Sequence, residues 1–378
     1  MKDIGVYVHI PFCKSKCLYC DFNSYTNKQD LVEKYIYYLK KEIDLYTAEL
    51  KEFNVKTIFI GGGTPSYVDG RYIYEIIEHM NKRLNMSKLA EFSIEVNPKT
   101  LDREKLNIYK QIGINRISMG VQSFNNDMLK RIGRIHSAND VIETYNMIRK
   151  HGFDNINFDI MFNLPEQSID NVKDTLKKAI ILSADHISYY SLKLEEGTPF
   201  YISHQKSELQ LPDEDEEREM YHSGVELLKQ NGYYHYEISN FAKKEYKCEH
   251  NLIYWNVEPY VGLGISAHSN INNKRYGNLY DFEDYFTKID NKELPITEVE
   301  VINREMEMAE YIILGLRLIQ GINKSRFARR FSVDIGEKFG DIITKHVKQG
   351  LLYEDLNNIK LTKQGLDLCN LVFMDILP

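Results

Sequence analysis

The chain has 378 residues, of which 43% are hydrophobic and 27% are charged, and its formal net charge is −7. This composition is typical of a soluble globular protein, and the negative charge argues against a broad basic surface for nucleic acid. The longest apolar runs, such as Tyr311–Leu316, are too short to span a membrane, and no signal peptide precedes the first strand. The five cysteines are odd in number and unevenly spaced, which indicates a reducing cytoplasm rather than a disulfide framework.

Short apolar runs alternate with longer amphipathic segments over the first 200 residues. The apolar runs predict strands at about 5–10, 57–60, 92–96, 116–121, 156–161 and 186–192. The amphipathic segments predict helices at about 28–50, 72–84, 126–132, 138–151 and 169–182. Strand–helix units in series favour an α/β fold, a parallel sheet with helices outside it. Because six units are too few to close an eight-fold barrel, we expect an open three-quarter (β/α)6 barrel.

Beyond the predicted barrel the pattern changes twice. The acidic run Asp213–Glu217 opens an amphipathic segment, so it predicts the start of a helix rather than a metal site. We therefore divide the chain into a barrel (1–232), an irregular aromatic connecting region (233–300) and a C-terminal domain (301–378). The last domain is mostly helical, with a hairpin over 351–361, and forms a winged-helix-like unit. Since the chain is acidic, a structural or partner-docking role is favoured over nucleic-acid binding there.

Three cysteines lie within eight residues directly after the first strand. Cys13, Cys17 and Cys20 have the spacing C-x3-C-x2-C. Thiolates this close can wrap one compact soft-metal centre. A zinc site would need four protein ligands, and residues 21–23 supply no further Cys or His. A zinc knuckle or ordinary buried cysteines are the alternatives, whereas three thiolates suit a [4Fe–4S] cluster with one open iron.

Polar residues and glycines follow the predicted strands where each strand ends. The second strand runs into Gly61–Pro65, G-G-G-T-P, where glycines let the backbone approach a ligand closely. Glu95, Gln122 and Asp159 lie at or near the ends of later strands, and Arg134 can pair with a carboxylate. A tight turn and carboxylates satisfied in the core are the alternative interpretation. Because barrels of parallel strands bind ligands at this edge, we expect one pocket there.

The cysteine motif resembles that of the radical S-adenosylmethionine (SAM) superfamily, whose open cluster iron chelates the amino and carboxylate groups of SAM. Nearly the whole chain, including the C-terminal domain, is similar to the oxygen-independent coproporphyrinogen III oxidase family. The stretches that carry this resemblance are Tyr7–Cys13, Gly61–Pro65, Ile94–Pro98, Gly120–Phe124 and Asn157–Met161. The resemblance implies a [4Fe–4S] cluster on the three cysteines. It also implies a SAM pocket lined by Tyr7, Tyr19, Gly62, Gly63, Thr64, Glu95, Gln122, Arg134 and Asp159.

Two departures from the oxidases distinguish this chain within the family. The first is a loss: Phe22 stands where the oxidases carry a further cysteine, and Cys13 lies too near the start for their N-terminal extension. An enzyme that decarboxylates through a substrate radical must shield that radical from water, so coproporphyrinogen III oxidation is not expected.

The second departure is a gain, the stretch His250–Trp255 with the pattern H-N-x-x-Y-W. It resembles the signature of the HemW-type heme chaperones. An imidazole can ligate heme iron, and aromatic rings can flank a porphyrin. The residues that form this hypothetical heme site are His250, Asn251, Tyr254 and Trp255. The alternative is a structural loop that uses Trp255, the only tryptophan, as a packing anchor.

The sequence thus predicts a cytoplasmic protein of radical SAM fold that binds a [4Fe–4S] cluster, SAM and heme. It predicts transfer of heme to a recipient such as a respiratory enzyme, membrane-associated ones included, and no nucleic-acid partner. A homodimer is left open. The alternative is a radical SAM enzyme that acts on a porphyrin, either by oxidative decarboxylation of coproporphyrinogen III or by methylation and opening of a heme ring.

Overall fold

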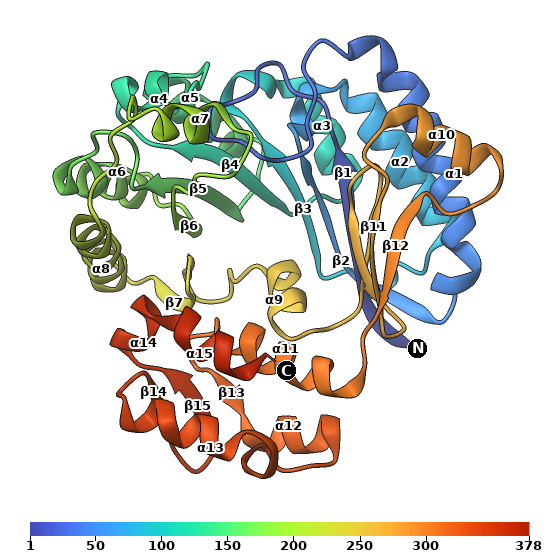
Figure 1. Cartoon of the computed structure of the whole chain (residues 1–378). Helices are drawn as coiled ribbons and strands as arrows, with labels where there is room; N and C mark the ends of the chain where they lie inside the picture. The colour runs from blue at the N-terminus through green and yellow to red at the C-terminus, as the bar shows by residue number, and fades with distance from the viewer. Residues whose placement is uncertain (378) are drawn as a thin grey trace.

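Six parallel strands form the centre of the structure, as the alternating pattern predicts. The computed structural model describes residues 1–377, and Figure 1 shows the strands curving side by side. They are β1 (Lys2–Ile10), β2 (Phe53–Gly62), β3 (Glu91–Val96), β4 (Arg116–Gln122), β5 (Ile156–Phe162) and β6 (His186–Ser191). They lie next to one another in chain order, so the ends of β2 to β6 meet along one edge of the sheet. The predicted parallel α/β core is therefore confirmed.

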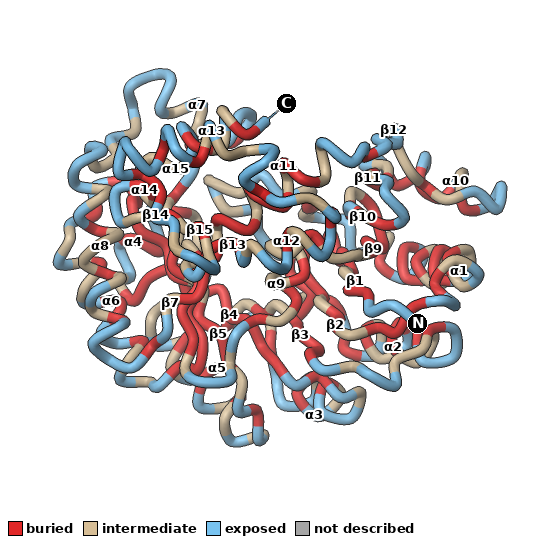
Figure 2. The backbone as a smooth tube through the Cα atoms, turned by 90° about the horizontal axis from the view of Figure 1, so that it is seen from below, coloured by how far each residue is buried: buried red, intermediate tan, exposed pale blue. Residues whose placement is uncertain are grey.

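Helices cover the outside of this sheet and bury their apolar stripes against it (Figure 2). They are α1 (Val32–Leu50), α2 (Gly70–Arg83), α3 (Arg103–Gln111), α4 (Asn126–Arg131), α5 (Ala138–Lys150) and α6 (Ile169–Ile181). Helix α3 was not predicted. It has nine residues, and its buried side chains are only Leu106 and Tyr109, too few to reveal a helical period.

The predicted irregular region, 233–300, extends both edges of the sheet. Strands β7 (Tyr234–Glu237) and β8 (Asn240–Ala242) continue from β6. On the other edge, β1 is followed by β9, β10, β11 and β12, which span Tyr260–Leu263, His268–Ile271, Lys274–Asn278 and Ile296–Val301. Within residues 1–377 the sheet has twelve strands. These added strands are only three to six residues long, too short for a reliable alternating pattern.

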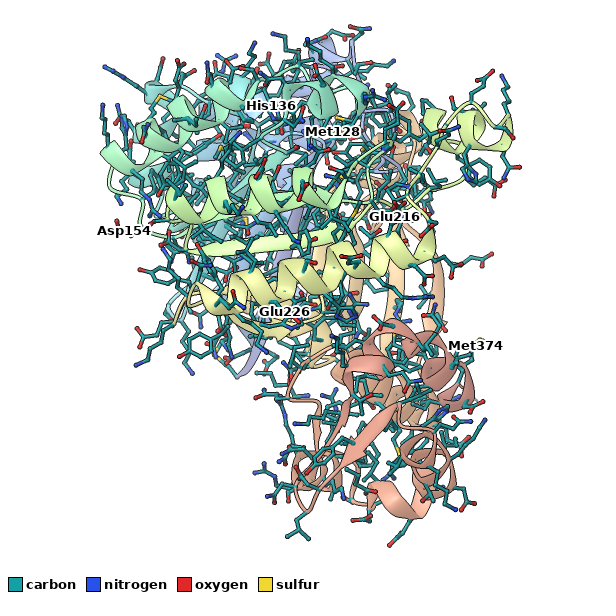
Figure 3. The ribbon with its side chains drawn as sticks, turned by 90° about the vertical axis from the view of Figure 1, so that its left-hand side faces the viewer. Met128, His136, Asp154, Glu216, Glu226 and Met374 are labelled. Carbon is teal, nitrogen blue, oxygen red and sulfur yellow. The ribbon has the colours of Figure 1, made fainter. Side chains whose placement is uncertain are left out.

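The acidic run Asp213–Glu217 begins a helix, as predicted. After the short helix α7 (Pro199–Gln205), helix α8 (Glu214–Gln230) starts with a reciprocal cap. The Asp213 carboxylate accepts from the backbone N–H of Glu216, whose carboxylate accepts from the backbone N–H of Asp213. Figure 3 shows α8 along one side of the barrel, with Glu216 and Glu226 labelled.

The C-terminal domain consists of small helices around a three-stranded sheet (Figure 1). Its elements are α11 (Arg304–Gly315), β13 (Ile322–Asn323), α12 (Lys324–Phe331), α13 (Ile335–Lys348), β14 (Leu352–Glu354), β15 (Asn358–Leu361), α14 (Lys363–Asp367) and α15 (Cys369–Ile376). This order agrees with a winged-helix-like unit. It packs beside α9 (Glu249–Trp255), whereas α10 (Phe282–Asp290) lies on α1. No helix within residues 1–377 is long and apolar enough to cross a membrane.

Candidate functional site

The cysteine loop follows β1 and is fixed by backbone hydrogen bonds to distant segments. The Cys13 N–H donates to the Tyr25 carbonyl oxygen at 2.9 Å, and the Leu18 N–H donates to the Ile132 carbonyl oxygen at 3.2 Å. The Thr64 N–H, from the loop after β2, donates to the Phe12 carbonyl oxygen at 2.9 Å. The loop is therefore held between the ends of two strands rather than hanging free.

All three thiols of this loop line one cavity of about 310 Å³ at the ends of the parallel strands. The Cys13 Sγ lies 3.6 Å from the Thr64 hydroxyl, and burial raises the pKa of the Cys13 and Cys20 thiols. Within residues 1–377, no three Cys, His, Asp or Glu side chains are grouped tightly enough to hold a single metal ion.

Most of the predicted cofactor-binding residues line the same cavity. They are Tyr19, Gly62, Gly63, Thr64, Glu95, Gln122, Arg134 and Asp159. The sequence did not single out several further lining residues: Asn97, Ser118, Gly120, Ser188 and Tyr190. These lie on or beside strand ends, so the parallel register itself is the signal that could have identified them.

The glycine loop after β2 brings bare backbone up to the cysteine loop. Gly62 has φ +112°, and its N–H donates to Glu95 Oε2 at 3.2 Å. A Cβ atom added to Gly62 would lie 2.6 Å from the His9 ring, and one added to Gly63 would lie 3.0 Å from Cys13 Sγ. The left-handed backbone therefore requires glycine at position 62, and the close approach of neighbouring atoms favours glycine at positions 62 and 63.

Two carboxyl groups share the floor of the cavity, on β3 and β5. Burial, followed by repulsion from Asp159, raises the pKa of Glu95 to about 8. Burial also raises the pKa of Asp159, although Asn157 donates to it at 2.6 Å and Ser118 at 3.2 Å. The pair can accept hydrogen bonds from a cationic or hydroxylated ligand, which would favour the ionised forms.

Besides the exposed Lys16, Arg134 is the cation that lines the cavity. It donates to the Asn97 side-chain oxygen at 2.9 Å and to the Tyr19 hydroxyl at 3.0 Å. Its Nε is buried and has no partner within residues 1–377. The backbone of Gln122 has φ +63°, at the point where the register between β4 and β5 shifts. Its side chain lines the cavity and accepts from the Tyr190 hydroxyl at 3.1 Å.

Tyr7 is the predicted pocket residue that lies behind the cavity rather than in its lining. Its hydroxyl is 3.0 Å from Nδ1 of His9, whose Nε2 lies 2.9 Å from the Asn23 carbonyl oxygen in the cysteine loop. Burial raises the pKa of Tyr7 well above its usual value and lowers that of His9 to about 4. Tyr7 and His9 are therefore neutral, and they contact the cysteine loop through the Asn23 carbonyl oxygen.

The H-N-x-x-Y-W stretch forms helix α9, away from the cysteine cavity. His250 is 1% exposed and stacks on Phe59. Its Nδ1 lies 2.7 Å from the Thr57 hydroxyl and its Nε2 lies 2.8 Å from the Tyr254 hydroxyl. Burial, with the nearby Arg116 charge, lowers the pKa of His250 to about 3. Both ring nitrogens of His250 are thus within hydrogen-bond distance of hydroxyl groups of the protein.

Trp255, at the end of α9, faces the C-terminal domain instead. Its ring lies 4.4 Å from the Arg317 guanidinium, a cation–π contact between the two domains. Asn251 is half-buried on the same helix. Of the four residues of the hypothetical heme site, His250 is buried, Asn251 and Tyr254 are half-buried, and Trp255 makes an interdomain contact.

The residues at the strand ends fit a cluster-bound SAM. Three thiols stand beside bare glycine backbone, two carboxyl groups can accept from an ammonium or hydroxyl group, and Arg134 has an unpaired buried N–H. With its parallel strands and C-terminal-edge cavity, this is the architecture of a radical SAM protein.

Comparisons with known proteins agree with this class. The Radical SAM superfamily model matches residues 7–179, and the HemN C-terminal domain model matches residues 302–368. The superfamily implies a [4Fe–4S] cluster and SAM. In overall fold, the chain resembles the coproporphyrinogen III oxidase HemN from Escherichia coli with a TM-score of 0.87. The match covers 99% of this chain and 90% of that chain at 23% identity.

Curated relatives give the family more narrowly. The Bacillus subtilis protein named heme chaperone HemW is 38% identical over 98% of both chains. The Lactococcus lactis protein of the same name is 36% identical over 98% of this chain and 97% of its own length. The Escherichia coli protein named heme chaperone HemW is 38% identical over 72% of this chain and 71% of its own length. The chain belongs to the HemW family.

Proposed function

We propose that the protein is a cytoplasmic heme chaperone that binds a [4Fe–4S] cluster, SAM and heme, and hands the heme to a recipient. The proposed recipient is a heme-requiring respiratory enzyme, membrane-associated ones included. The observation that carries this proposal is the full-length similarity to relatives named heme chaperone HemW. Relatives that match over the barrel and the C-terminal domain together support a shared function better than a match to the barrel alone.

For the cluster, Cys13, Cys17 and Cys20 are the proposed ligands. Their thiols line one cavity, and the loop that carries them is fixed at several points by backbone hydrogen bonds. The cluster would supply an iron with an open coordination position and an electron.

For SAM, we assign the residues at the strand ends by chemistry. Glu95 and Asp159 are carboxylates for an ammonium or hydroxyl donor, and Arg134 is a donor for a carboxylate. The backbone at Gly62, Gly63 and Thr64 provides a close, side-chain-free wall, whereas Tyr19 and Gln122 complete the cavity. Tyr7 acts from behind through His9.

The exposed side chain of Phe22, 60% accessible at the edge of the cysteine loop, supports a chaperone over a porphyrinogen oxidase. A phenyl ring can neither transfer a hydrogen atom nor donate a proton. A step that depends on a thiol at this place would therefore be absent from this chain.

An anaerobic comparison of two porphyrins tests the proposal. Cluster-loaded protein is titrated with heme and, separately, incubated with coproporphyrinogen III, SAM and a reductant. We expect stoichiometric heme binding, transfer of that heme to a heme-free respiratory protein, and no protoporphyrinogen. Multiple-turnover decarboxylation would overturn the proposal in favour of an enzyme. A failure to bind heme would overturn the chaperone proposal without favouring an enzyme.

A further inference from the structure

A second and larger cleft lies between the barrel and the C-terminal domain. Its volume is about 720 Å³, within the roughly 300–1,000 Å³ typical of small-molecule sites. Aromatic rings line it from both domains: Tyr19 and Phe22 from the cysteine loop, Tyr190 on β6, Tyr221 on α8 and Phe373 on α15. Tyr19 and Tyr190 also line the cysteine cavity, so the two spaces are adjacent. A flat aromatic ligand suits such walls.

Arg317 brings an unpaired positive charge into this cleft. Within residues 1–377 its guanidinium makes no hydrogen bond or ion pair, and its Nε is buried without a partner. The buried Glu237 carboxylate is near enough to feel the charge of Arg317, but its Oε1 accepts from the Ser239 N–H and the Asn240 side chain, and its Oε2 has no hydrogen-bond partner among these residues. A buried donor without a partner is costly, so an anionic ligand group would gain from meeting Arg317.

Two features fix the position of Arg317. The turn that carries Arg317 is bonded to the segment around β7. The Arg317 carbonyl oxygen accepts from the Ile238 N–H at 3.0 Å, and the Ile319 N–H donates to the Tyr236 carbonyl oxygen at 3.1 Å. Trp255 then holds the guanidinium by its ring face at 4.4 Å. The last residue of the H-N-x-x-Y-W stretch thus contacts the charge that lines the cleft.

The charges along the cleft are unevenly distributed. The remaining cations in the lining are Lys193, which is exposed, and Arg218, which is paired with Glu214 and Asp215. Burial raises the pKa of the Cys369 thiol, although the nearby charges of Arg317 and Lys193 act to lower it. The acidic residues of the lining are Asp21, Glu195, Glu214, Glu217 and Asp367. Since Glu214 and Glu217 begin α8, a dianionic ligand would turn its carboxylates away from that helix and toward Arg317.

We propose that this cleft receives the porphyrin of heme and that Arg317, positioned by Trp255, anchors a heme propionate. The inference rests on the proposed function, because it names the place where the heme of that function binds. It gives the H-N-x-x-Y-W stretch a part in heme binding that does not require His250 as an iron ligand.

The test compares heme with its dimethyl ester, in which both propionates are neutral. Cluster-loaded wild-type protein should bind heme on the order of 10- to 100-fold more tightly than the diester, as expected for losing a charge-assisted hydrogen bond. Equal affinity for the two hemes would overturn the inference without any variant being made. If the wild type bound neither heme, the proposed function would fail and this inference with it.

Variants then assign the anchor. Arg317→Gln should weaken heme binding by a similar factor and leave diester binding unchanged. Arg329→Gln, at an exposed arginine of α12, is the matched control and should change neither. SAM affinity should stay at the wild-type level, because Arg317 lies outside the cysteine cavity. Unchanged heme affinity in Arg317→Gln, or an equal loss for both hemes, would overturn the assignment.

The positioning role of Trp255 has its own signature. Trp255→Leu should lower heme affinity but not diester affinity, and the effect should be less than additive with Arg317→Gln. Trp255→Tyr, which keeps a ring face for the guanidinium, should restore most of the affinity. A loss for heme and diester alike in Trp255→Leu would show a structural effect and reject the positioning role.

Discussion

Glu95 combines two conditions that favour its neutral form. It is partly buried at the end of β3, and Asp159 lies near it on β5. Together these raise its pKa to about 8, against about 4.3 for a free glutamate. The folded protein therefore holds a proton here that the unfolded chain releases across the intervening pH range.

Glu95→Gln should reveal this proton as a pH-dependent gain in stability. The free energy of unfolding of the wild type should fall as pH rises from about 5 to about 8, because Glu95 loses its proton readily in the unfolded chain but keeps it in the folded protein. Glutamine stays neutral, so its advantage over wild type should grow by on the order of 1–3 kcal/mol across that range. Denaturant unfolding of cluster-free protein at both pH values measures it. A pH-independent difference would contradict the raised pKa.

The three loop cysteines should each be necessary for the cluster. Replacing Cys13, Cys17 or Cys20 by Ser should remove bound iron and acid-labile sulfide, because thiolates are the ligands that suit such clusters. Cys369→Ser is the control and should keep full occupancy. The measurement is iron and sulfide per chain after anaerobic reconstitution. Full occupancy in any one of the three variants would rule out the proposed ligand set.

At the scale of single elements, helix α9 is fixed to the barrel by its first turn. His250 joins Thr57 on β2 to Tyr254 one turn further along the helix. The backbone N–H of Glu249 donates to the Glu91 carboxylate at 2.6 Å, and the Cys248 thiol donates to the same group at 3.3 Å. The end of the helix is thereby aimed at the C-terminal domain.

His250→Ala should therefore destabilise the fold. It removes a buried ring and leaves the hydroxyl groups of Thr57 and Tyr254 without their partner, at a cost of about 2–4 kcal/mol. The exposed His268 on β10 provides the control, and His268→Ala should change stability by less than about 0.5 kcal/mol. Denaturant midpoints of both variants decide the matter. Wild-type stability in His250→Ala would contradict this structural role.

The sequence predicted the strand-end site better than the surroundings of α9. Glu95 and Asp159 could be placed together because strands in chain order bring their ends to one edge. The contact of His250 with Thr57 joins residues 193 positions apart, and no local pattern reports it. Likewise, β7 to β12 are too short for periodicity, and Arg317 belongs to no motif. What sequence reasoning missed depends on long-range packing.

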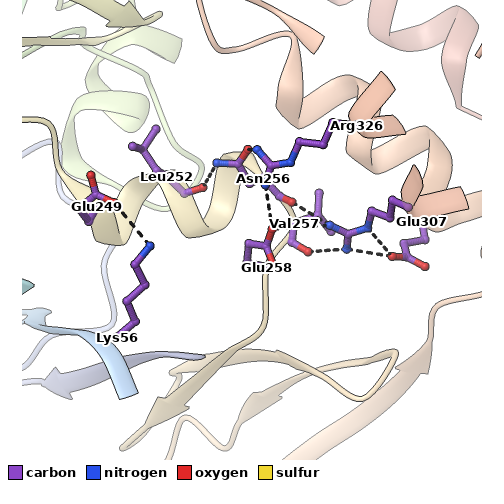
Figure 4. A network of polar contacts seen from close by, with 9 residues as sticks. Lys56, Glu249, Leu252, Asn256, Val257, Glu258, Glu307 and Arg326 are labelled. Atoms are coloured by element: carbon purple, nitrogen blue, oxygen red, sulfur yellow. Dashed lines mark hydrogen bonds and ion pairs between the residues drawn. The ribbon is translucent and has the colours of Figure 1, made fainter. Parts of the chain in front are cut away.

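At the scale of the whole molecule, two arginines of α12 join the C-terminal domain to the end of α9 (Figure 4). Arg326 donates to the Asn256 side chain at 2.8 Å and pairs with Glu258 at 3.0 Å. Arg330 donates to the carbonyl oxygens of Asn256 and Val257 and pairs with Glu307 at 2.9 Å. These contacts hold α12 against the segment that follows α9.

Arg330→Ala should loosen this junction. It removes bonds to two backbone carbonyl groups and leaves Glu307 unpaired, so we expect a loss of about 1–3 kcal/mol in domain docking. The neighbouring exposed residue offers a control, Arg329→Ala, for the loss of a positive charge alone. Hydrogen exchange at the backbone amides of Asn256 to Glu258 should accelerate in the first variant only. Equal exchange in both would mean that the junction does not depend on Arg330.

The position of β1 has a consequence for how the protein is made. This strand is synthesised before the other strands of the sheet, yet it lies inside the sheet, between β2 and β9. Its partner Tyr260–Leu263 emerges some 250 residues later, so one edge of β1 stays unpaired during most of translation. The cysteine loop also waits for late contacts, since the Tyr25 hydroxyl donates to the Tyr280 carbonyl oxygen. The pairing of β1 with β9 and this late contact of the cysteine loop can therefore form only after residues 260–280 have been synthesised.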